Sequence, residues 1–149
     1  MKKTPNPQRP TPNIEWEKGN VAETPNGEYA ARRKYDLEER LLTFTAAVVR
    51  LADSLPNTKA GNHVAGQLLR CGTSPLANHG EVEAAESRKD FLHKLRICLK
   101  ELRETWRWLR LMGRLELTTD SQLRATLTEI EELIRIFAAS VRTTEKNAK

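Results

Sequence analysis

The chain has 149 residues, a length that suits one domain of ordinary size and leaves no room for a second. Hydrophobic residues make up 38% of it and charged residues 30%, so it can bury only a modest core. The formal net charge of +5 permits a polyanionic partner. A membrane-spanning helix is excluded, because the longest apolar run, 46–49, is far shorter than the roughly 20 residues that cross a bilayer.

The two cysteines, Cys71 and Cys98, are too few for a disulfide framework and lack the CxxC spacing of zinc and redox sites. We therefore expect a reducing compartment and predict a cytoplasmic protein. Both cysteines fall on the core side of predicted helices, where a free thiol usually acts as a small hydrophobe.

Residues 1–34 hold five of the seven prolines and show no apolar period typical of a helix or strand. Such a segment cannot bury enough apolar surface to order itself, so we predict a disordered N-terminal leader. Within it, Ile14 and Trp16 are candidates for a short docking motif.

A first amphipathic helix is predicted over 36–55. Asp36 suits the N-cap, with Glu39 three residues later, and Pro56 stops the helix. Its apolar residues alternate in steps of four and three, which places them in one stripe: Leu37, Leu41, Phe44, Val48, Leu51 and Leu55.

A second helix is predicted over about 58–85. We expect a kink or a break near 73–75, because Pro75 cannot donate to the carbonyl four residues earlier. Its core side holds Val64, Leu68, Cys71, Pro75 and Val82.

The third predicted helix is capped by Ser87, with Asp90 in its first turn, and closed by Gly113. Its core side holds Phe91, Leu95, Cys98, Leu102, Trp106, Leu109 and Met112. The fourth helix is predicted to open at Thr119. Its stripe holds Leu123, Leu127, Ile130, Ile134, Phe137 and Val141.

These patterns predict an all-α protein. Four amphipathic helices joined by short loops, with no period-2 run, are typical of an antiparallel up-down-up-down four-helix bundle. We expect this bundle over residues 35–142, followed by a polar C-terminal tail over 143–149.

The third helix also has a continuous basic face, called the basic ridge below. Its members again step by four and three along the helix: Lys89, His93, Arg96, Lys100, Arg103, Arg107, Arg110 and Arg114. Between Arg88 and Arg114 there are six arginines, three lysines and three acids, a charge of +6, whereas the rest of the chain sums to −1.

One interpretation is that the basic ridge merely solubilises an exposed face. However, like charges one turn apart repel by roughly 0.2–0.5 kcal/mol per pair, a cost that interleaved acids would avoid. Arginine also suits phosphate, because its planar guanidinium can donate two hydrogen bonds to it. We therefore predict that the ridge binds a nucleic-acid backbone, largely independently of sequence.

A further apolar line on the third helix is displaced from its core stripe, on the side away from the arginines: Ile97, Trp108, Leu111 and Leu115. One bundle cannot cover both faces well, and a leftover apolar strip often marks a subunit interface. We predict self-association through this line. The alternative is that a leader or loop residue such as Trp16 covers it.

The chain has no Gly-rich phosphate loop, GxSxG elbow or HExxH motif. Asp90 and His93 have the spacing of carboxylate and histidine ligands in di-iron bundles, but the first and fourth stripes are wholly apolar. We predict no catalytic residue, no metal site and no cofactor.

Three stretches of the chain resemble a known bacterial family: 69–81, 85–95 and 99–105. They look like the four-helix-bundle proteins first met as open reading frames in intervening sequences of 23S ribosomal RNA genes. The resemblance covers about 35–112. Four residues match the family pattern, and we interpret them as structural: Asn78, Glu81, Ser87 and Asp90. His79 stands where such proteins often have Tyr.

The resemblance implies a ring-shaped homo-oligomer, typically a pentamer, with a basic surface. It also implies a fold similar to the accessory protein of diversity-generating retroelements, which binds RNA and a reverse transcriptase. With the basic ridge, this predicts a non-enzymatic, homo-oligomeric RNA-binding accessory protein that assists a reverse transcriptase ribonucleoprotein. The alternative is an oligomeric protein-interaction scaffold whose arginines meet an acidic protein.

Overall fold

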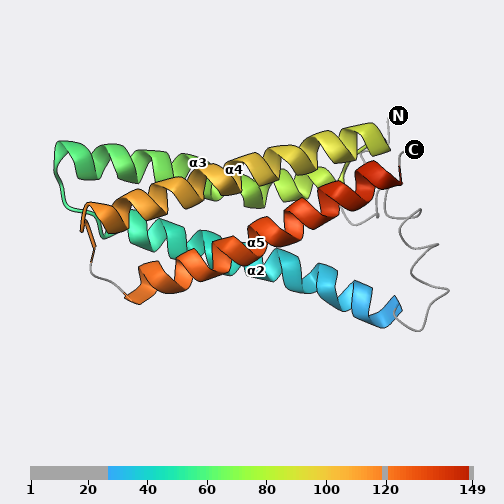
Figure 1. Cartoon of the computed structure of the whole chain (residues 1–149), viewed down its shortest axis with the longest axis horizontal. Helices are drawn as coiled ribbons and strands as arrows, with labels where there is room; N and C mark the ends of the chain where they lie inside the picture. The colour runs from blue at the N-terminus through green and yellow to red at the C-terminus, as the bar shows by residue number, and fades with distance from the viewer. Residues whose placement is uncertain (1–26, 119–120, 148–149) are drawn as a thin grey trace, which may run out of the picture.

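The computed structural model describes residues 27–118 and 121–147. These residues form four helices and no strand: α2 (Gly27–Asp53), α3 (Lys59–Glu83), α4 (Arg88–Arg114) and α5 (Ser121–Lys146). Each helix packs against the next one in the chain, and α2 also contacts α5 (Figure 1). The predicted all-α four-helix bundle is confirmed.

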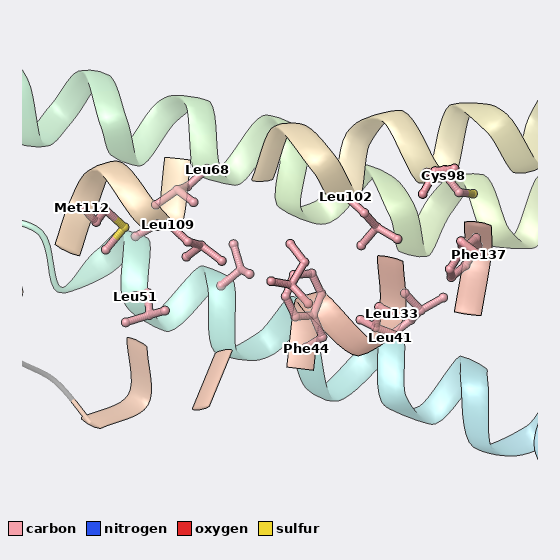
Figure 2. Packing of buried hydrophobic residues seen from close by; sticks show 14 of the residues in the cluster. Leu41, Phe44, Leu51, Leu68, Cys98, Leu102, Leu109, Met112, Leu133 and Phe137 are labelled. Atoms are coloured by element: carbon pink, nitrogen blue, oxygen red, sulfur yellow. The ribbon is translucent and has the colours of Figure 1, made fainter. Parts of the chain in front are cut away.

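The core runs along the inside of the bundle and draws on all four helices (Figure 2). On α5 the buried face differs from the predicted stripe, because Leu133 is fully buried whereas Leu127 and Ile134 are only partly covered. Two threonines share this face. The hydroxyls of Thr126 and Thr144 donate to the carbonyls four residues earlier, at 2.7 and 2.9 Å, which lets these polar groups be buried.

The first helix begins upstream of its predicted start. Asp36 lies inside α2 rather than at its N-cap, and residues 27–34, which we assigned to the disordered leader, belong to the helix. The physical reason is composition, since Glu, Ala, Arg and Lys between 28 and 34 favour a helix. Residues 1–26, with Ile14 and Trp16, and the predicted cap Thr119 lie outside the described residues.

The second helix is continuous from Lys59 to Glu83, so the chain does not break near Pro75, where we predicted a kink or a break. Pro75 is buried against α4, where the Cys98 thiol lies 3.9 Å from its carbonyl oxygen. Close packing between α3 and α2 also explains why residue 72 is a glycine, because a Cβ there would come within 2.5 Å of a Val48 methyl on α2.

The ends of α4 fix its length. At the start, the Ser87 hydroxyl accepts from the Asp90 N–H at 3.1 Å, which confirms the predicted cap. At the end, Gly113 is still helical, and Glu116 adopts the left-handed backbone with φ of 50°. Helix α5 also ends beyond its predicted end. It reaches Lys146 and so includes part of the predicted C-terminal tail.

Candidate nucleic-acid interface

The structure places the whole basic ridge on the exposed surface of α4. All eight members are solvent-exposed: Lys89, His93, Arg96, Lys100, Arg103, Arg107, Arg110 and Arg114. The buried residues of α4 lie on its other sides, and Leu102 and Leu109 among them are fully buried in the core. The helical period alone therefore located this face correctly.

The acids of α4 point toward α3, away from the ridge. Glu104 forms an ion pair with Arg70 of α3, and Glu101 lies 3.9 Å from the same guanidinium. The third acid, Asp90, pairs with Lys94 at 2.8 Å. This hydrogen bond lowers the pKa of Asp90 and raises that of Lys94. The carboxylates of α4 are thus engaged on the α3 side and do not neutralise the basic ridge.

Two ridge members have partners from the protein itself. Arg96 forms an ion pair of 2.5 Å with Glu145 of α5. Arg110 lies over the ring of Trp106, 4.5 Å from its centroid, and the Trp106 Nε1–H donates to Glu131 at 3.3 Å. Both partnerships are on the α5 side of the helix.

The centre of the ridge lines a groove between α4 and α5. The groove has a volume of about 400 Å³. Its walls are Arg96, Leu99, Lys100, Arg103 and Arg107 from α4, with Ala138, Val141 and Arg142 from α5. Four of these cations form no ion pair with any residue in 27–118 or 121–147: Lys100, Arg103, Arg107 and Arg142.

Arg142 is the groove residue that our sequence analysis missed. It stands alone among apolar and small residues in the printed sequence, so no local pattern singles it out. The available signal was topological. Helices joined by a short loop run antiparallel, and Arg142 and Arg96 lie at similar separations from the α4–α5 loop, so they come to the same level of the bundle.

The sequence matches the 23S rRNA-intervening sequence protein family over residues 33–139, more than half of the chain. The chain belongs to this family. A comparison with curated proteins gives no match. Among solved structures, this family member is similar to a protein of unknown function from the S23 ribosomal protein family of Bacteroides thetaiotaomicron. The two share 35% sequence identity and a TM-score of 0.65, over 70% of this chain and 97% of the other.

The apolar line predicted as a subunit interface is only partly exposed in this family member. Leu111 and Leu115 are 38% and 50% exposed. Ile97 and Trp108 are partly buried, and the Trp108 ring makes an edge contact with His63 of α3, with 5.8 Å between centroids. The exposed part of the line is therefore its C-terminal end.

The remaining chemical candidates are held in structural roles. Within the described ranges, no three His, Cys, Asp or Glu side chains gather as a metal site, and no helix there is long and apolar enough to cross a membrane. Both thiols are free and buried as predicted. Burial raises the pKa of Cys71, and it raises the pKa of Cys98 to about 12. His79 is buried beside Phe137, with their centroids 6.1 Å apart.

Proposed function

We propose that this protein is a non-enzymatic RNA-binding accessory protein that holds the phosphate backbone along the groove between α4 and α5. One observation carries the proposal: four cationic side chains without a carboxylate partner among the described residues converge on this groove, namely Lys100, Arg103, Arg107 and Arg142. Membership of a family named for 23S rRNA supports RNA as the polyanion.

The energetics favour phosphate at this site. Unpaired cations in a row repel one another, and a phosphate backbone removes that repulsion while it releases its own condensed counterions. From Arg96 to Arg107 the ridge is roughly 17 Å long at 1.5 Å per residue, which is room for several phosphates. Contacts of this kind fix the position of the strand and carry little sequence information.

Fluorescence anisotropy with a labelled RNA oligonucleotide at fixed salt tests the proposal. The double variant Arg103→Gln/Arg107→Gln removes two groove cations. The matched control, Arg50→Gln/Lys59→Gln, removes two exposed charges from α2 and α3. We expect the groove variant to bind about tenfold or more weakly and the control to bind nearly as the wild type does. Equal affinities for the two variants would contradict the proposal.

We further propose that the protein acts as a ring-shaped homo-oligomer, in which several copies of a weak groove bind one RNA. Repetition raises the effective concentration of each site for the strand. The exposed Leu111 and Leu115 support a subunit contact at the end of α4. The double variant Leu111→Ser/Leu115→Ser should dissociate in sedimentation experiments and lose RNA affinity with its fold intact. An unchanged mass would contradict this assembly.

The reverse transcriptase implied by the resemblance is the protein partner that we propose for the RNA-bound form. Co-purification tests this, with and without ribonuclease. Capture that depends on RNA supports a shared ribonucleoprotein, whereas the absence of a reverse transcriptase both from the captured material and from neighbouring genes would contradict it.

A further inference from the structure

The groove between α4 and α5 has an apolar floor, which a phosphate backbone alone does not explain. The floor is made by Leu99, Ala138 and Val141. Leu99 and Val141 are 7% and 8% exposed, so a small strip of their surface opens to the groove. Phosphates gain nothing from such a strip, whereas the flat face of a nucleobase can cover it and remove apolar surface from water.

The cationic side chains at the edges of the groove also suit a nucleobase and its flanking phosphates. Arg103 and Arg107 on one wall and Arg142 on the other have no carboxylate partner within the described chain, so their planar guanidinium groups are available to stack on a base or to hold a flanking phosphate. Next along α4, Arg110 already lies on the Trp106 ring at 4.5 Å, which shows a guanidinium in this stacking role on the same surface.

The size of the groove fits one base with its sugar. Its volume of about 400 Å³ lies within the range of roughly 300–1,000 Å³ found for pockets that hold small molecules. A duplex keeps its bases stacked inside and presents phosphates and riboses outward, so its bases cannot reach the apolar floor. A single strand can turn a base out of the stack.

We infer that the groove binds single-stranded RNA, with one unstacked base on the floor of Leu99, Ala138 and Val141 and the flanking phosphates on the surrounding arginines. This inference rests on the proposed function, because it names the form of RNA that the groove takes. The base adds a contact that every nucleobase can make, so it confers a preference for single strands and little preference for sequence.

Three probes separate the base from the phosphates: a labelled 12-nucleotide oligouridylate, an RNA strand of the same length without bases, and a 12-base-pair RNA duplex. Stacking of a base on an aromatic side chain changes affinity by about fivefold or more, and here the aliphatic floor and the arginine side chains supply the contact. We therefore expect the full-length protein to bind oligouridylate at least fivefold more tightly than the strand without bases. Equal affinities for these two strands would overturn the inference.

A pair of neighbouring alanines provides the matched variants. Ala138→Phe fills the floor and leaves every cation in place, whereas Ala139→Phe adds the same side chain at an exposed position outside the groove. We expect Ala138→Phe to lose the preference for oligouridylate over the strand without bases, and Ala139→Phe to retain it. Because Ala138 packs against the core, Ala138→Leu serves as the smaller filling if circular dichroism shows that the Phe variant unfolds.

The outcomes distinguish this inference from the proposed function. If none of the three probes binds, the proposed function fails. If all three bind with similar affinity and both alanine variants behave alike, RNA binding stands and the base-binding groove is wrong. A preference for oligouridylate that survives in both Ala138→Phe and Ala138→Leu would place the base elsewhere and overturn the inference.

Discussion

The two flanks of α4 use charge in opposite ways. Toward α3, the acids Glu101 and Glu104 meet Arg70. Toward α5, the cations Arg103 and Arg107 line a groove and meet no acid among the described residues. One helix therefore has a flank built for stability and a flank that leaves charge available for a partner.

This contrast shows why net charge alone is a weak guide to function. The chain as a whole is only modestly basic at +5. The acids of α4, however, pair with Arg70 and Lys94 and not with the cations of the groove, so the groove is more positive than the net charge suggests. The local field that a polyanion meets depends on which charges are already paired.

The greatest loss of stability is expected where α3 crosses α2. Gly72→Ala forces a methyl group toward Val48, and overpacking of this kind destabilises by about 1–3 kcal/mol. Gly66→Ala is the matched change on the same helix, since a Cβ there meets nothing within 4 Å, and it should stabilise by roughly 0.5–1 kcal/mol. Urea denaturation measures both, and a stable Gly72→Ala variant would contradict close packing at this crossing.

Alkaline pH tests the burial of Cys98, which lies where α4 meets Pro75. Its folded-state pKa of about 12 exceeds the ordinary value of 9.0, so the unfolded chain loses the thiol proton first. The stabilising contribution is complete below pH 9 and declines as the pH rises toward 12, by up to about 1.4 kcal/mol per pH unit. In urea denaturation between pH 8 and 11, Cys98→Ala should show a shallower decline than the wild type.

Identical substitutions on the two flanks should have opposite effects. Arg70→Gln leaves Glu101 and Glu104 without their partner and should lower the unfolding free energy by about 0.5–1 kcal/mol while RNA affinity stays unchanged. Arg103→Gln should leave stability unchanged or raise it by roughly 0.2–0.5 kcal/mol, and should weaken RNA binding. Thermal denaturation measures the stability of both variants, and anisotropy measures their RNA affinity. An equal loss of RNA affinity in the two variants would contradict the difference between the flanks.

A smaller change in affinity is expected at Glu145, the acid that pairs with Arg96 of the groove. Glu145→Gln frees Arg96 from its ion pair and removes a negative charge, so RNA affinity should rise about twofold to fivefold. The control is Glu129→Gln, which removes the same charge from the side of α5 that pairs with Arg40 of α2. An equal gain in both variants would indicate a general charge effect and no special position for Arg96.

The sequence predicted the elements whose signals are local. The steps of four and three located the exposed ridge, and the Ser87 cap set the start of α4. What it could not predict depends on how helices meet. Arg142 joins the groove only when α5 docks on α4. Leu133 lies in the core where Ile134 was predicted, on the face where two threonines bury their hydroxyls.

The salt dependence of RNA binding tests whether the unpaired groove cations hold the phosphates. For a single strand, each phosphate neutralised by a cation contributes about 0.7 to the slope of log affinity against log salt. Replacing all four unpaired groove cations with Gln (Lys100, Arg103, Arg107 and Arg142) should therefore flatten that slope by about 2.8 while circular dichroism shows an intact helical fold. A slope that is the same in the wild type and in this quadruple variant would contradict the account.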